Sequence, residues 1–203
     1  MSNLQLHMLR VAGVSSLICN YIGDSINSRE VITACLLHDM GNIIKFDLKA
    51  FPQYLEPEGL SYWEEVKSEY IVKYGRNEHD ATGMILVELG VSNSVKKLVG
   101  AVGFSNAIEN LNSKDIARQI CAYSDMRLKP ERVCSLSERF EDGAKRYKIT
   151  DEQIKAKQIE NAKALFDIER QLCGMGGFLP ESLSDVAIKD SIVGLSEYDI
   201  LVV

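Results

Sequence analysis

The stretch ACLLHDMG, residues 34–41, decides how the rest of the chain is interpreted. It closes an apolar helical pattern that begins after Ser28 and ends in the pair His38-Asp39, followed by a glycine. An imidazole and a carboxylate brought together in the core of a helical bundle make a mixed nitrogen and oxygen site for a divalent first-row metal. The stretch therefore predicts a metal pocket inside a bundle of helices.

Helical periodicity continues on both sides of this stretch. Apolar residues at three- and four-residue spacings predict a helix from Leu4 to Gly23, with His7 on its inward stripe. Further helices are expected over residues 61–74, 77–90, 92–103, 114–125, 135–148 and 150–173. Residues 46–59 are expected to form a loop, because Pro52 and Pro57 disfavour a long helix there. The predicted fold class is all-α, a helical bundle.

The composition changes after the run Gly-Met-Gly-Gly at residues 174–177. We therefore expect a helical domain over residues 1–173 and a small C-terminal extension over residues 174–203. The glycine run lacks the GxGxxG spacing and a preceding strand, so it is interpreted as a helix end and a linker. Residues 198–203 are compatible with a short strand or with an apolar end that packs on a partner, and a homo-oligomer stays open.

Composition excludes several classes of protein. The chain has 203 residues, with 23 Lys and Arg against 29 Asp and Glu and a net charge of −6, so a broad basic surface for nucleic acid is not expected. Its five cysteines are scattered and form no CxxC pair, which is typical of reduced thiols in a cytoplasmic protein. No apolar run approaches the roughly 20 residues that span a bilayer, so no membrane segment is expected.

The third histidine, His79, is also followed by an aspartate. Asn77 and Asp80 resemble a helix-capping pair, which explains Asp80 without any chemistry and leaves His79 to face the pocket. We interpret His79 as a contact for substrate phosphate or a general acid, with metal ligation and a plain surface histidine as alternatives. Basic residues are candidates for phosphate binding because a guanidinium matches phosphate oxygens. Arg76 and Lys45 are preferred, and the further candidates include Arg127 and Lys129.

An isolated histidine, a His-Asp pair and a later aspartate, all on helices, resemble the motif of the HD-domain metal-dependent phosphohydrolases. The matching stretches are LHMLRVA with His7, ACLLHDMG with His38 and Asp39, and ICAYSDM with Asp125. The resemblance extends over residues 1 to about 148. It implies a divalent ion held by these four residues, with the choice among Mn, Fe, Co, Ni, Zn and Mg left open.

The resemblance has two departures. Many family members carry a lysine after the glycine of the pair, where this chain has Asn42, and Lys45 follows three residues later. Dinuclear subfamilies carry extra histidines, of which only His79 is present, so a single ion is favoured.

The resemblance also implies an activity. It is the hydrolysis of a phosphomonoester or phosphodiester, on a nucleotide or another small phosphorylated metabolite. From their positions near the expected metal, we expect Asp39 and His79 to be the catalytic residues. The alternative is a non-catalytic HD-type module that binds a metal or nucleotide and acts on a partner through its C-terminal extension. An oxygenase with two irons is a weaker third option, since it needs more histidines.

Overall fold

Ten α-helices account for most of the residues that the computed structural model describes, which are 1–50, 52–146, 150–200 and 202. They are α1 (Ser2–Ile22), α2 (Ser28–Leu37), α3 (Leu60–Tyr74), α4 (Glu78–Glu88), α5 (Asn93–Ala101), α6 (Ala107–Ser113), α7 (Ile116–Met126), α8 (Leu136–Arg146), α9 (Glu152–Gly176) and α10 (Asp185–Leu195). They are connected by the short 3-10 helices η1 (Asn42–Lys45), η2 (Pro52–Leu55), η3 (Phe104–Asn106) and η4 (Pro180–Ser182), and by an antiparallel hairpin of β1 (Leu128–Lys129) and β2 (Arg132–Val133). The predicted all-α class is confirmed. Across the described residues, none of the helices combines the length and the apolar character that crossing a membrane requires.

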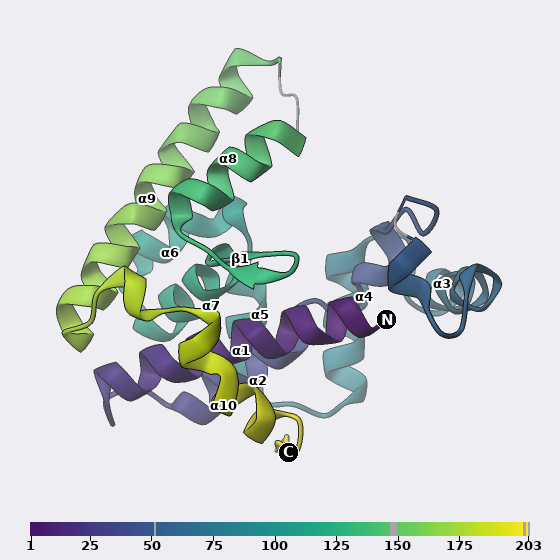
Figure 1. The fold of residues 1–203 in the computed structure, drawn as a ribbon, viewed down its shortest axis with the longest axis horizontal. Helices are drawn as coiled ribbons and strands as arrows, with labels where there is room; N and C mark the ends of the chain where they lie inside the picture. The colour runs from purple at the N-terminus through teal and green to yellow at the C-terminus, as the bar shows by residue number, and fades with distance from the viewer. Residues whose placement is uncertain (51, 147–149, 201, 203) are drawn as a thin grey trace.

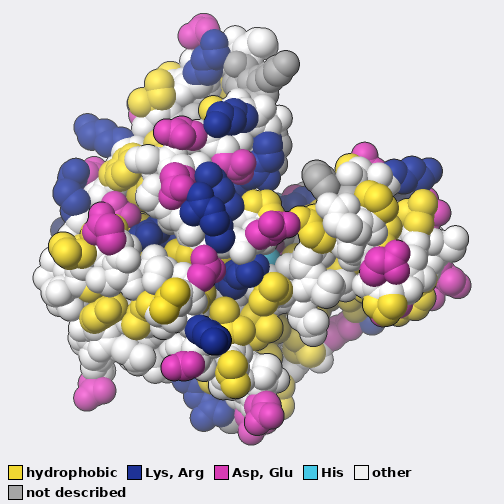
Figure 2. All heavy atoms as spheres, in the orientation of Figure 1, with side chains coloured by type: hydrophobic (Ala, Val, Ile, Leu, Met, Phe, Trp, Pro, Cys, Tyr) yellow, Lys and Arg dark blue, Asp and Glu magenta, His cyan; other side chains and the backbone are white. Residues whose placement is uncertain are grey.

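The helices form a larger lobe around α1 and a smaller lobe around α3 (Figure 1). Helix α1 packs against α2, α7, α9 and α10, so it runs through the middle of the larger lobe. Helix α3 packs against α4 and against η1 and η2. The face seen in Figure 2 is hollowed between the two lobes, and a histidine side chain is visible in the hollow.

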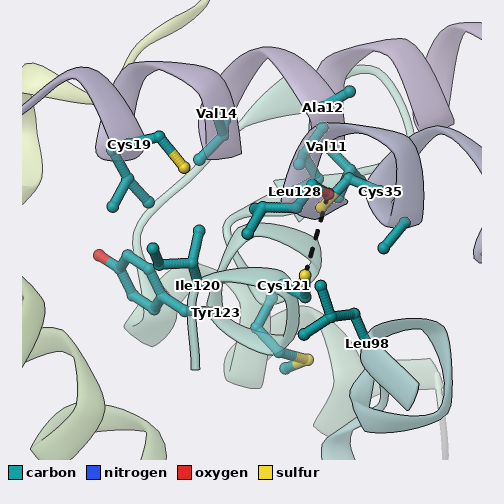
Figure 3. Packing of buried hydrophobic residues seen from close by; sticks show 14 of the residues in the cluster. Val11, Ala12, Val14, Cys19, Cys35, Leu98, Ile120, Cys121, Tyr123 and Leu128 are labelled. Atoms are coloured by element: carbon teal, nitrogen blue, oxygen red, sulfur yellow. Dashed lines mark hydrogen bonds between the residues drawn. The ribbon is translucent and has the colours of Figure 1, made fainter. Parts of the chain in front are cut away.

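Each lobe has its own apolar core. In the larger lobe, Val11 of α1, Cys35 of α2 and Ile120 of α7 are fully buried members of one cluster (Figure 3). In the smaller lobe, Ile43 and Ala81 are buried in a second cluster, beneath aromatic side chains of α3. Because the apolar residues are divided in this way, polar side chains are left along the boundary between the lobes.

Capping side chains start the helices where the sequence predicts them. Asn77 Oδ1 accepts hydrogen bonds from two backbone N–H groups at the start of α4, and Ser92 Oγ accepts one at the start of α5. Ser135 and Glu138 exchange hydrogen bonds at the start of α8, as a capping box requires.

The structure differs from the prediction between residues 107 and 133. Residues 107–113 form α6, which periodicity does not reveal because the helix has only two turns. Ser113 therefore ends one helix instead of starting the next, and the N-cap of α7 is Asp115, whose carboxylate accepts from the N–H of Arg118. The β1–β2 hairpin is also unpredicted, because strands of two residues carry no periodic signal.

The C-terminal segment packs on the first helix. Helix α9 continues past residue 173 and ends at Gly177, whose φ of 65° is a left-handed conformation that suits glycine. Ile188 of α10 is fully buried against α1, where a Cβ added to Gly13 would lie 3.2 Å from its Cβ. The described residues 198–200 form no strand, and residues 201 and 203 lie outside the described part. The boundary at residue 173 stays a prediction.

Candidate metal centre

Four of the predicted site residues come together in space. His7 lies in the second turn of α1, His38 and Asp39 directly follow α2, and Asp125 lies in the last turn of α7. His7 Nε2 lies 3.6 Å from Asp39 Oδ2 and 3.2 Å from Asp125 Oδ1. His38 Nε2 lies 3.6 Å from each of the same two oxygens. Both histidines therefore face both carboxylates across one small space.

The donor set fits a divalent cation. Histidine nitrogens and carboxylate oxygens bind such ions at about 2.0–2.2 Å, which puts neighbouring ligand atoms about 3 to 3.5 Å apart, close to the distances here. The Nδ1 atom of His38 lies 2.8 Å from the carbonyl oxygen of Cys35 and donates to it. His38 Nε2 is buried and has no hydrogen-bond partner. A metal ligand has these properties, with one ring nitrogen held by the protein and the other directed at the ion.

The two carboxylates control the protonation of the site. Burial by itself lowers the pKa of His38, but the charges of Asp39 and Asp125 outweigh it and raise this pKa to about 10. Burial likewise raises the pKa of Asp125, but the close approach and the charge of His38 and His7 outweigh it and hold this pKa well below its usual range. In the absence of a metal, a proton on His38 therefore compensates the two carboxylates.

A cavity of about 1380 Å³ opens from these side chains. It is lined by the metal-site residues and by residues of η1, α4, α5, the β1–β2 hairpin and α8. Ligand pockets for small molecules are commonly about 300–1,000 Å³, so the cavity has room for a metabolite of nucleotide size or larger.

Gly41, the glycine of the His-Asp motif, lies where α4 touches the metal site. A Cβ at this position would lie 2.3 Å from the carbonyl oxygen of Glu78 and 2.9 Å from the backbone nitrogen of Thr82. The N–H of Gly41 donates to Thr82 Oγ1 at 2.9 Å, and this hydroxyl donates in turn to the Glu78 carbonyl. The glycine thus lets the first turn of α4 pack directly on the chain that carries His38 and Asp39.

A comparison with known protein families matches residues 5–161 to the HD domain. The protein belongs to the HD-domain family. HD domains form a superfamily of metal-dependent hydrolases that bind divalent metals. Searches of curated proteins and of solved structures returned no match.

Three predicted site residues of this HD domain lie away from the four clustered side chains. His79 lines the cavity, but its side chain is 77% exposed and its Nε2 lies 3.8 Å from Glu78 Oε1. Lys45 also lines the cavity and forms a salt bridge of 3.7 Å with the same carboxylate. Arg76 is exposed and is not among the lining residues, because it lies in the turn before α4 instead of on the face that α4 presents to the cavity.

Two other basic candidates have opposite outcomes in the HD domain. Lys129 lines the cavity. Arg127 is only 2% exposed and directs its guanidinium at protein acceptors, so it is a structural residue and the suggestion of phosphate binding is wrong.

Several cavity residues were not singled out from the sequence. Lys96 of α5 and Arg139 and Arg146 of α8 line the cavity without belonging to any motif. The only signal in the sequence is their charge, which many solvent-exposed residues share. Asn42, which is a departure from the motif, is 4% exposed and also lines the cavity.

The metal affinity of the HD domain is expected to rise with pH. His38 binds a metal only as the neutral imidazole, whereas its pKa of about 10 keeps it protonated in the metal-free protein. Each bound ion therefore displaces a proton, and the apparent association constant increases about tenfold per pH unit between roughly pH 6 and 8. Calorimetric titration in buffers of different ionisation enthalpy measures the released protons. An affinity that is flat over this range would contradict the expectation.

The stability of the metal-free HD domain is expected to fall as the pH rises. The pKa of His38 in the folded state is above its ordinary value of 6.5, so its contribution to stability is complete below about pH 6.5 and is lost as the pH rises toward 10. Urea unfolding of chelator-treated protein at pH 6.5 and pH 9 is expected to show lower stability at the higher pH. If the His38→Ala variant lost as much stability between pH 6.5 and pH 9 as the wild type, His38 would not be the origin of the effect.

Substitution of Gly41 by alanine is expected to lower both the stability and the metal content of the HD domain. The new methyl group overlaps backbone atoms of α4, and such overpacking costs about 1–3 kcal/mol. Gly174→Ala is the matched control, because that position is an exposed part of α9 with open space around it and is expected to gain about 0.5–1 kcal/mol. Urea unfolding of both variants gives the comparison, and equal stability would show that α4 moves away without cost.

Proposed function

We propose that this HD domain hydrolyses a phosphate ester or anhydride of a nucleotide or another small phosphorylated metabolite. The observation that supports this most directly is the convergence of two histidines and two aspartates at one end of a large cavity. Ligand atoms of three of them, His7, His38 and Asp39, lie close enough to one another to hold a metal ion. His7, His38, Asp39 and Asp125 would hold a divalent ion, which would supply a Lewis acid and lower the pKa of a water molecule in the site.

Asp39 is proposed to position the attacking water. Its contacts with the two histidines use Oδ2, and its side chain is 22% exposed, whereas that of His38 is 2% exposed. In the described part of the chain, no hydrogen bond to Asp39 Oδ1 is found. Asp39 lines the cavity, so this oxygen is available to orient a water molecule there and to accept its proton as the new oxygen–phosphorus bond forms.

His79 is proposed to protonate the leaving group. Its imidazole lines the same cavity from α4, and its high exposure lets it reach a bound substrate. As the bond between phosphorus and the leaving oxygen breaks, a proton from His79 neutralises the charge on that oxygen.

The proposal is tested with purified protein to which Mn, Fe, Co, Ni, Zn or Mg is added in turn. The expected result is metal-dependent release of product from at least one substrate in a panel of phosphomonoesters, phosphodiesters and nucleotides. Thermal stabilisation by panel members without any turnover would instead support the non-catalytic module. That alternative is motivated by Asn42, which stands where the motif commonly has a lysine.

A further inference from the structure

Three cationic side chains from separate elements line the cavity. They are Lys96 of α5, Lys129 of β1 and Arg139 of α8. Figure 2 shows Lys and Arg side chains bordering the hollow on the side of the larger lobe. These side chains are positively charged, whereas the chain as a whole carries a net charge of −6.

Among the described residues, two of these three cations lack a carboxylate partner. Over the described ranges, neither Lys96 nor Lys129 forms a salt bridge with a carboxylate. The Nε atom of Arg139 is buried without a hydrogen-bond partner, and its Nη1 lies 3.8 Å from Asp142 Oδ2. Lys45, on the opposite wall, differs because Glu78 compensates it. Asp47 and Asp142 also line the cavity, and Asp142 pairs with Arg139. The uncompensated positive charge therefore lies at Lys96 and Lys129, where it favours an anion.

Lys96, Lys129 and Arg139, which we call the cationic wall, lie within reach of the metal centre. Lys129 follows the ligand Asp125 by only four residues, and an extended chain spans at most about 3.6 Å per residue, so their Cα atoms are less than about 15 Å apart. Helix α8, which carries Arg139, packs against β1, which carries Lys129. One molecule in the cavity can therefore contact both the metal ligands and the cationic wall.

We propose that Lys96, Lys129 and Arg139 form a second anion subsite. The substrate class is then a small metabolite with at least two phosphate groups, one at the metal centre and the other on these three side chains. This inference rests on the proposed function for the role of the metal centre, but the subsite itself is a binding site and can be tested by binding alone. Phosphate oxygens accept from several donors at once, which suits a subsite of two ammonium groups and one guanidinium.

The test uses inorganic pyrophosphate and inorganic phosphate as probes in calorimetric titrations. Lys96→Gln/Lys129→Gln is compared with wild type and with Lys97→Gln, a matched control on α5 whose side chain is exposed and is not among the cavity-lining residues. The double variant is expected to bind pyrophosphate at least about tenfold more weakly, whereas Lys97→Gln is expected to stay within about twofold of wild type. Equal pyrophosphate affinity in the double variant and the control would overturn the subsite.

A second arm separates the subsite from the metal, which pyrophosphate also binds. The titrations are repeated in the His38→Ala background after chelator treatment, with circular dichroism to verify the fold. Dependence of pyrophosphate binding on Lys96 and Lys129 is expected to persist there, and its loss would overturn the proposal. If the lysines control binding but no substrate is turned over, the proposed hydrolase activity fails while the subsite stands.

Discussion

Replacement of His38 by alanine is expected to remove the bound metal and to abolish hydrolysis. Its Nε2 faces both carboxylates at 3.6 Å and has no other partner, so no nearby group replaces it. Loss of residues that merely support a ligand costs about 10–100-fold in metal affinity, and loss of a ligand itself is expected to cost at least about 100-fold. Metal analysis by mass spectrometry after dialysis, together with turnover on the best substrate, measures both effects.

His79→Ala is the comparison for that variant. It is expected to keep the metal content of wild type, because its imidazole is exposed and lies outside the four clustered side chains. Turnover is expected to fall by about 10²–10⁴-fold, which is typical for loss of a general acid. Retention of metal by His38→Ala would refute the ligand assignment. Unchanged turnover in His79→Ala would refute the role of that histidine and leave the metal site intact.

Arg127→Met is expected to cause the largest loss of stability. Arg127 Nε donates to the Cys134 carbonyl at 2.6 Å, and Nη2 donates to the Pro180 carbonyl at 3.0 Å. Its Nη1 donates to Tyr123 Oη and lies 3.6 Å from Glu169 Oε2. One side chain thus ties the end of α7 to the hairpin, to α9 and to the C-terminal segment.

The expected decrease in the free energy of unfolding is about 3–5 kcal/mol, because removal of the guanidinium leaves the partly buried Glu169 carboxylate without its cation and the Cys134 and Pro180 carbonyls without their donor. Arg170→Met is the matched control, since Arg170 is an exposed residue of α9 paired with Asp167 and is expected to change stability by less than about 0.5 kcal/mol. In urea unfolding, Arg127→Met/Glu169→Gln is expected to lose less than the sum of its single variants. Additive losses, or a single variant as mild as Arg170→Met, would mean that the network contributes little.

Much of the helical structure was predictable because its causes are local in sequence. Asn77, Ser92 and the Ser135–Glu138 pair start helices through hydrogen bonds to backbone atoms within a few residues. Short elements such as α6 escaped prediction because they add too few residues to establish a period. Arg127 and Lys129 show the limit most clearly. The two are separated by one residue and carry the same charge, yet one is buried among carbonyl groups and the other lines the cavity.

The sequence by itself determined the helical class, through its apolar periodicity, and it predicted that His7, His38, Asp39 and Asp125 form one set, through the motif. Only the tertiary structure decided what surrounds that set. Arg76 stays at the surface, while Lys96 and Arg139, far apart in sequence, line one cavity. The need for a glycine at position 41 became clear only from the backbone of α4 above it. These features depend on how helices pack, and packing joins residues whose separation along the chain carries no information about their distance in space.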